Sequence, residues 1–152
     1  MERLAEITKR IVLDTSVIIH HLRGRKLESE VIVKLLEDSA NCVLATTIVN
    51  VYELYYGAYK SSDPKRGLSA AKGYLETIDV LQLDDRSADK SGKIMANLEA
   101  AGNAIDPRDL FTGCIALENG YSVLTNNRKH FERLPDLLVQ EPVDLVSPTA
   151  PK

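Results

Sequence analysis

Ile-Val-Leu-Asp-Thr-Ser-Val-Ile, residues 11–18, is the stretch of sequence that decides the fold. Its first three residues are apolar and predict a short buried strand, with Asp14 directly after it. From Ser16 the pattern becomes that of a short helix, which Gly24 ends. A strand that runs straight into a helix is typical of α/β domains, in which residues that follow a strand lie at the carboxyl edge of the sheet.

The same alternation continues along the chain. Short apolar runs predict further strands over residues 42–45, 80–83 and 122–124, and a fifth over 137–139. Because helices separate these strands, we expect an α/β fold with a parallel sheet covered by helices on both faces. The helices are expected over residues 16–22, 28–39, 46–59, from 64 onward, 84–102, 106–119 and 128–134.

Length and composition indicate one domain. The chain has 152 residues, of which 44% are hydrophobic and 27% charged, as in ordinary globular proteins. Trp is absent and Phe occurs only twice, so Leu, Ile, Val and Ala must form the core. We predict a single domain over residues 1–146 and a flexible tail over 147–152, with fraying expected around the prolines at 142, 148 and 151.

Charge and targeting signals narrow the function. The net charge of −3 argues against a protein that coats nucleic acid through bulk positive charge, but it allows an enzyme with local basic residues. No apolar run approaches the roughly 20 residues that span a bilayer, and the N-terminus lacks the apolar core of a signal peptide. Cys42 and Cys114 have no metal or disulfide spacing. We therefore expect a cytoplasmic protein with reduced thiols and no membrane contact.

Three carboxylates stand where an α/β fold could bring them together. Asp14 follows the first strand, Glu53 lies in a largely apolar helix, and Asp109 is in the first turn of another helix. A cluster of negative charge is costly in a folded protein unless a cation neutralises it. We interpret the trio as a divalent-metal site, because Mg²⁺ prefers hard oxygen ligands and keeps several waters. Such an ion suits phosphodiester cleavage.

Each acid has a simpler alternative. Asp14 could only cap the helix that follows it. Asp109 could complete a capping box, with Asp106 as N-cap and Pro107 at the first helical position. Glu53 has few apparent positive partners on its own helix face, although a partly exposed helix acid remains the alternative.

Histidines do not offer a competing site. His20 and His21 are adjacent, so they cannot face one ligand from a helix, and His130 is expected to be a surface residue. No Ser–His–Asp or Cys–His arrangement is evident in the chain.

Four segments in order resemble PIN-domain ribonucleases of the VapC type, which are the toxins of toxin–antitoxin pairs. They are IVLDTSVIIHHLRG, NVYELYYGA, DPRDLFTGCIAL and GYSVLTNNRKHF, at residues 11–24, 50–58, 106–117 and 120–131. The resemblance implies a three-layer α/β/α sandwich, a homodimer, and endonucleolytic cleavage of RNA by water that Mg²⁺ or Mn²⁺ activates. It also implies a small VapB-type antitoxin that covers the acidic groove.

The resemblance carries site roles over to individual residues. It gives the metal-binding acids as Asp14, Glu53 and Asp109, and hydroxyl groups that support the first acid or the substrate as Ser16 and Thr125. The fourth catalytic position, often Asp and sometimes Asn in the family, falls on Asn127. Loss of that negative charge weakens the case for a second tightly held metal, and Asp106 could compensate in part.

Two other functions fit parts of the sequence. One is a housekeeping RNA-processing nuclease of the same fold. The other is a non-catalytic signalling module that binds Mg²⁺, which requires an Asp after the third strand and a Lys after the fifth. Asp84 and Asp85 satisfy the first condition, but the fifth strand is followed by residues 140–142, Gln-Glu-Pro. We therefore prefer the nuclease.

Overall fold

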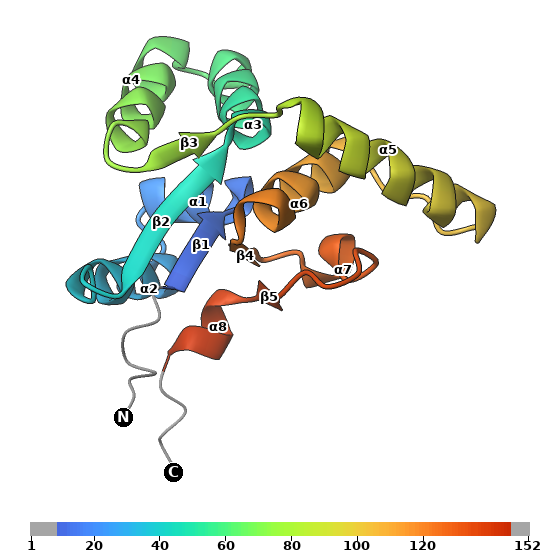
Figure 1. Ribbon diagram of the computed structural model, residues 1–152. Helices are drawn as coiled ribbons and strands as arrows, with labels where there is room; N and C mark the ends of the chain where they lie inside the picture. The colour runs from blue at the N-terminus through green and yellow to red at the C-terminus, as the bar shows by residue number, and fades with distance from the viewer. Residues whose placement is uncertain (1–8, 147–152) are drawn as a thin grey trace, which may run out of the picture.

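Five parallel strands form the centre of the structure, a computed structural model that describes residues 9–146 (Figure 1). Their order across the sheet is β3-β2-β1-β4-β5, and all four pairs of neighbours are parallel. The strands are β1 (Lys9–Leu13), β2 (Cys42–Thr47), β3 (Asp79–Leu81), β4 (Ser122–Leu124) and β5 (Val139–Gln140).

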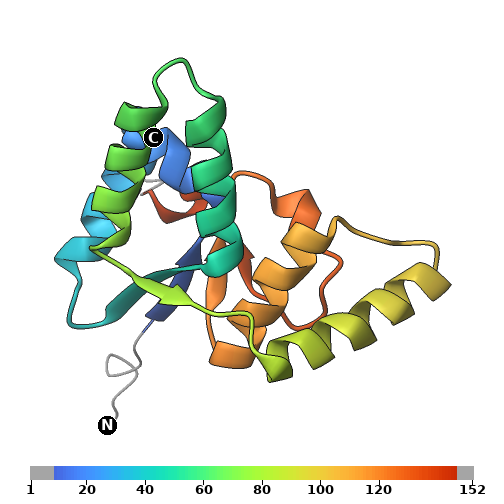
Figure 2. The ribbon, with the colours of Figure 1, turned by 90° about the horizontal axis from the view of Figure 1, so that it is seen from above.

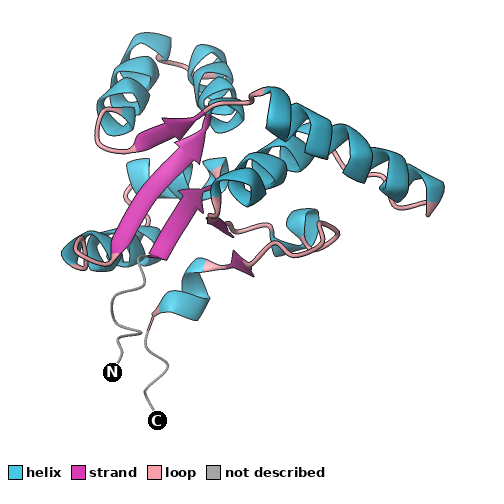
Figure 3. Ribbon diagram, in the orientation of Figure 1, coloured by secondary structure: helices cyan, strands magenta, loops and turns pink. Residues whose placement is uncertain are grey.

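Helices connect the strands, and Figure 3 shows how closely the two kinds of element alternate. Pairs of helices follow β1, β2 and β3, whereas single short helices follow β4 and β5. Within residues 9–146, no helix is long and apolar enough to cross a membrane. The helices are α1 (Thr15–Leu22), α2 (Lys26–Glu37), α3 (Ile48–Lys60), α4 (Pro64–Leu75), α5 (Asp85–Ala100), α6 (Pro107–Asn119), α7 (Arg128–Phe131) and α8 (Pro142–Leu145).

Successive side chains of β1 point to opposite faces of the sheet, and each face carries its own hydrophobic layer. Ile11 and Leu13 point to one face of the sheet and pack with residues of α1 to α4, whereas Val12 points to the other face and packs with α6 and α7. All three side chains are almost completely buried. Figure 2 shows the two groups of helices on opposite sides of the strands. The prediction of a three-layer α/β/α fold with a parallel sheet is confirmed.

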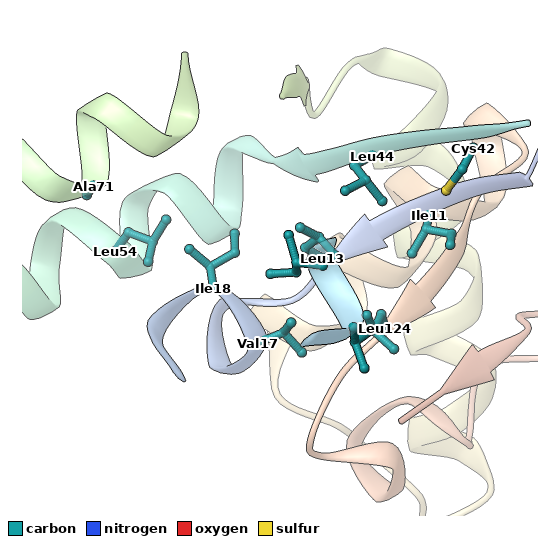
Figure 4. Packing of buried hydrophobic residues seen from close by; sticks show 11 residues of the cluster. Ile11, Leu13, Val17, Ile18, Cys42, Leu44, Leu54, Ala71 and Leu124 are labelled. Carbon is teal, nitrogen blue, oxygen red and sulfur yellow. The ribbon is translucent and has the colours of Figure 1, made fainter. Parts of the chain in front are cut away.

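The first layer is the larger core. Figure 4 shows Leu13 between Leu44 of β2 and Ile18 of α1, with Leu54 of α3 on the far side of Ile18. The layer consists mainly of branched aliphatic side chains, which suits a sheet that is buried on both faces. This packing fixes α1 and α3 against the carboxyl ends of β1 and β2.

The sheet has a topological switch point between β1 and β4. From β1 the chain builds outward through β2 to β3, and then returns to place β4 on the other side of β1. In open α/β sheets the crevice at the carboxyl ends of the strands at such a point is the usual place for a ligand. Asp14 directly follows β1 and Thr125 directly follows β4, so the two residues flank this crevice.

The end of the described chain differs from the sequence prediction. Pro142 was expected to fray, but it is buried and begins α8, in the first-turn position that proline tolerates well. Asp144 at N3 accepts a hydrogen bond from the backbone N of Glu141, so the short helix is capped. The predicted tail, residues 147–152, lies outside the described residues.

Candidate active site

A cavity of about 620 Å³ opens at the switch point of the sheet. Its lining contains the three predicted acids, Asp14, Glu53 and Asp109, together with Ser16 and Asn127. These residues come from α1, α3, α6 and the segments that directly follow β1 and β4. Side chains that are far apart in the sequence therefore share one cavity.

Asp14 is held by hydrogen bonds to its side chain and does not use that side chain to cap α1. It occupies the N-cap position, and its backbone oxygen accepts from Val17, but its carboxylate makes no capping bond. Instead, Oδ1 accepts from Asn50 Nδ2 at 3.1 Å and Oδ2 accepts from Thr125 Oγ1 at 2.7 Å. Because the residue is only 6% exposed, both oxygens are fixed in place. The side-chain cap that the sequence allowed is not present.

The loop after β4 supports Asp14 from one side. Thr125 is fully buried, and its hydroxyl donates to Asp14 while accepting from the backbone N of Asn127 at 2.9 Å. Ser16 accepts from the backbone N of Asn126 at 3.2 Å. Of the two hydroxyl positions predicted from the family resemblance, Thr125 thus contacts the first acid directly, and Ser16 holds the backbone of the loop. Asn127 is exposed at the rim, as the N-cap residue of α7.

Asn50 is a buried site residue that the sequence analysis did not identify. Its side-chain oxygen accepts from the backbone N and the hydroxyl of Thr47, so it closes a capping box at the start of α3. Its amide nitrogen donates to Asp14 and to Thr15. The sequence feature that could have identified Asn50 is its amide at position N3 of the helix capped by Thr47, one turn before Glu53.

Glu53 faces the cavity from α3. Oε1 accepts a 2.6 Å hydrogen bond from Thr15 Oγ1, and Oε2 lies 3.6 Å from Nη1 of Arg108. The positive partner that its own helix lacks therefore comes from α6. The side chain is 23% exposed, so a solvated cation can reach it.

Asp109 lies at the start of α6 without acting as a cap. The predicted N-cap Asp106 is confirmed, since its Oδ1 accepts from the backbone N of Arg108. The predicted capping box is wrong, because α6 has no such box and Asp109 Oδ2 lies 3.3 Å from Nδ1 of His130. His130 is exposed, as expected, but it contacts the site from α7.

The acids repel one another. Burial raises the pKa of Asp109 to about 6, and the negative charges of Asp14, Asp106 and Glu53 add to the increase, although His130 opposes it. Burial also raises the pKa of Asp14, and the charge of Glu53 contributes, while hydrogen bonds from Thr125 and Asn50 act against it. Burial is the largest cause of both shifts, and repulsion between the carboxylates adds to it.

The donor set fits a hard divalent cation that retains part of its water shell. Within the described part of the chain, no three His, Cys, Asp or Glu side chains are placed to ligate one ion directly as they stand. However, three carboxylates line the same cavity, and two of them have raised pKa values because of burial and mutual repulsion. Mg²⁺ usually takes only one or two protein carboxylates and keeps its waters. The carboxylates therefore fit such an ion, which prefers oxygen ligands to nitrogen and sulfur.

Basic side chains surround the acids. Arg108, Lys129, His130 and Arg133 all line the same cavity. Arg108 is oriented by Asp106, which accepts from Nε at 3.1 Å and from Nη2 at 2.9 Å. The result is an acidic centre with a basic rim, which suits a ligand that is anionic along its length and binds a metal at one point.

Comparisons with known proteins agree with the fold. The sequence profile of the PIN domain matches residues 11–137, and the chain belongs to the PIN domain family. A relative from Salmonella typhimurium, the tRNA(fMet)-specific endonuclease VapC, is 34% identical over 106 residues, which is 70% of this chain and 78% of that protein. Ribonuclease VapC2 of Haemophilus influenzae is 30% identical and covers 82% of this chain and 92% of its own length. The chain is thus of the VapC type within its family.

A solved structure extends the likeness to three dimensions. The DNA-bound VapBC of Salmonella typhimurium contains a chain that is 28% identical, with a TM-score of 0.77 over 90% of this chain and 99% of that chain. The family resemblance seen in the sequence motifs is therefore confirmed by sequence and by fold.

Proposed function

We propose that the protein is a Mg²⁺- or Mn²⁺-dependent endoribonuclease that cleaves RNA phosphodiesters, and that it is the toxin of a VapBC-type pair. The single observation that carries the proposal is the shared cavity of Asp14, Glu53 and Asp109. Its basic rim and the VapC relatives named above support RNA as the substrate. A cytoplasmic location, where transcripts and tRNA reside, is part of the proposal.

Each residue has a distinct task in the proposed reaction. Asp14, Glu53 and Asp109 hold the ion, which supplies an activated water and neutralises charge on the phosphate when bound. Asn50 and Thr125 keep the Asp14 carboxylate in one orientation by donating to its two oxygens. Asn127 lies at the rim, where its amide can contact the substrate.

The basic rim holds the RNA backbone. Arg108, Lys129 and Arg133 line the same cavity as Asp109 and can pair with the phosphates beside the scissile bond. Arg108 is already held in a fork by Asp106, so little side-chain entropy is lost when it meets a phosphate. Because Asp106 is engaged in this way, we assign it to positioning Arg108 and not to the metal.

The partners follow from the charge of the cavity. A small VapB-type antitoxin could silence the enzyme by inserting an Arg among the carboxylates, where the ion would otherwise sit. Several solved structures of similar fold are VapBC complexes, including the DNA-bound pair from Salmonella typhimurium. We also propose a homodimer, in keeping with the family resemblance.

RNA cleavage tests the proposal. The purified protein should cut RNA internally with Mg²⁺ or Mn²⁺ and lose this activity in EDTA. Asp14→Asn should reduce cleavage by about two orders of magnitude or more, because it removes an ion ligand. Asp89→Asn changes an exposed acid of α5 and should leave cleavage unchanged. Full activity in the Asp14 variant, or in EDTA, would refute the proposal.

A second assay separates the toxin from a housekeeping nuclease of the same fold. Expression of the wild-type chain should arrest growth, and co-expression of the small protein encoded beside it should restore growth. A housekeeping enzyme would be tolerated at the same level of expression and would co-purify with no such protein.

A further inference from the structure

Glu28 is a buried acid that lies outside the catalytic cavity. Its side chain is 7% exposed, on the first turn of α2, and it does not line the cavity. An acid in that turn would normally face solvent and interact with the helix dipole. The burial of this carboxylate therefore calls for another explanation.

One carboxylate oxygen of Glu28 accepts hydrogen bonds from two other segments of the chain. Oε2 accepts from His20 Nδ1 of α1 at 3.1 Å and from Asn126 Nδ2 at 3.1 Å. The two nitrogens lie 3.2 Å apart because both are directed at this oxygen. Burial alone would raise the pKa of Glu28, but the hydrogen bonds from His20 and Asn126 hold it below its usual value. The carboxylate is therefore ionised at neutral pH.

Asn126 connects this buried acid to the catalytic cavity. Its neighbour Thr125 donates to Asp14, and its other neighbour Asn127 lines the cavity. The backbone N of Asn126 donates to Ser16, which also lines the cavity. The side chain of Asn126 donates to Glu28 instead. The loop is consequently anchored twice, by Ser16 and Asp14 at the site and by Glu28 outside it.

Burying a carboxylate to hold a loop has a large desolvation cost. Apolar residues of similar size often stabilise a protein as well as a buried ionic group does, so burial of Glu28 is not explained by stability alone. What a charged acceptor provides is direction, because it fixes two donors at defined angles. The precise angle matters here, since a displacement of Thr125 would rotate the carboxylate of Asp14.

We propose that Glu28, with His20, is a positioning residue that orients the loop of residues 125–127 for catalysis. This inference rests on the proposed nuclease function. Glu28 acts through Asn126 and touches neither the ion nor the RNA. Its loss should therefore slow the chemical step while leaving RNA binding by the basic rim largely intact.

The test uses Glu28→Gln in the full chain, which keeps the shape but removes the charge. A Gln oxygen is a weaker acceptor, so Asn126 and His20 are held less firmly. We expect kcat for RNA cleavage to fall about tenfold, while KM changes less than about twofold. The matched control is Glu30→Gln, which alters an exposed acid of the same helix and should change neither constant.

Hydrogen exchange gives a readout that needs no catalysis. The backbone N–H groups of Asn126 and Asn127 are bonded to Ser16 and Thr125, so both should exchange slowly in the wild type. In Glu28→Gln their exchange should become about tenfold faster, because the loop opens more often. Exchange of Val12, in the central strand β1, should not change if the rest of the fold is intact.

Exchanging the amide of residue 126 with the carboxylate of residue 28 distinguishes an orienting role of Glu28 from a role in packing alone. Asn126→Asp alone places two carboxylates face to face and should lower kcat further. Combining it with Glu28→Gln restores an amide–carboxylate pair in the reverse direction, and kcat should recover at least in part. Rescue together with local exchange changes supports the inference.

Three results would overturn the positioning role of Glu28. An unchanged kcat in Glu28→Gln, equal loss in the Glu30 control, or faster exchange throughout the sheet would each show that Glu28 does not position the loop. If the wild type cleaves no RNA, the proposed function fails, and unchanged loop exchange in Glu28→Gln would then refute the anchoring role separately.

Discussion

The raised pKa of Asp109 predicts that the catalytic cavity costs the protein stability when no cation is bound. In the folded chain this carboxyl group has a pKa of about 6, compared with 3.8 for an unperturbed Asp. Replacing Asp109 with Asn removes the charge and keeps the shape. The variant should therefore be more stable than the wild type in EDTA at pH 8, although it should lose metal binding.

The gain in stability expected for Asp109→Asn follows from the pKa shift of Asp109. About two pKa units correspond to about 3 kcal/mol, and each unit is about 1.4 kcal/mol. The side chain is 21% exposed and lies near His130, so solvent and that contact reduce the gain. We expect about 1–2 kcal/mol, or a Tm increase of about 2–8 °C for a chain of this size.

The pH dependence has a definite sign. Because the folded state binds the Asp109 proton more tightly than the unfolded state, ionisation penalises folding. The penalty is absent well below pH 3.8, grows between pH 3.8 and about 6, and is constant above that. The advantage of Asp109→Asn should therefore be largest above pH 6 and shrink as the pH falls toward 4.

Thermal unfolding in EDTA across this pH range is the assay. The control is Asp85→Asn, the same change in the first turn of α5, where the acid is exposed and should give no gain. Added Mn²⁺ should raise the Tm of the wild type more than that of Asp109→Asn. A variant that is less stable than the wild type at pH 8, or equally stabilised by Mn²⁺, would refute the reasoning.

Three further predictions concern single contacts. Thr125→Val removes the donor to Asp14 and should lower the free energy of unfolding in urea by about 1–3 kcal/mol, together with cleavage; full stability would contradict the contact. Gly113→Ala places a Cβ against Cδ1 of the buried Leu134 and should cost about 1–3 kcal/mol by overpacking, with little effect on the kcat of the folded protein. An unchanged Tm would contradict that packing. Asn127→Asp adds a fourth acid at the rim and should tighten Mn²⁺ binding about tenfold in calorimetry, whereas weaker binding would show that this position does not face the ion.

The sequence predicted the fold well because its signals are local. The pattern of Ile11–Leu13 predicts a buried strand. Thr47 and Pro107 mark the starts of α3 and α6 in the structure, and Gly120 marks the end of α6. The convergence of three acids also followed from simple topology, since residues after parallel strands meet at one edge of the sheet.

The contacts that tune the site could not be predicted in this way. Arg108 meets Glu53, and His130 meets Asp109, only because α3, α6 and α7 converge around the cavity. Asn50 was overlooked because an amide at N3 of a helix reads as an ordinary capping residue. The capping box expected for Asp109 failed because a buried carboxylate beside other acids turned toward His130.

The sequence did not predict α8 for a related reason. Proline is both a helix breaker and a good first residue of a helix, and the choice depends on what the next residues can bury. Here Leu145 and Val146 pack against the core of α1 to α4, and this contact selects the helix. The pattern of four residues is too short to show that in the sequence.

Mn²⁺ titration followed by calorimetry, on the wild type and on Asp14→Asn, Glu53→Gln and Asp109→Asn, tests the central claim most directly. If these three carboxylates hold one catalytic ion, each variant should lose at least about tenfold in Mn²⁺ affinity, and RNA cleavage should fall in parallel. If any one of the three binds Mn²⁺ and cuts RNA as the wild type does, that acid is not part of the metal centre.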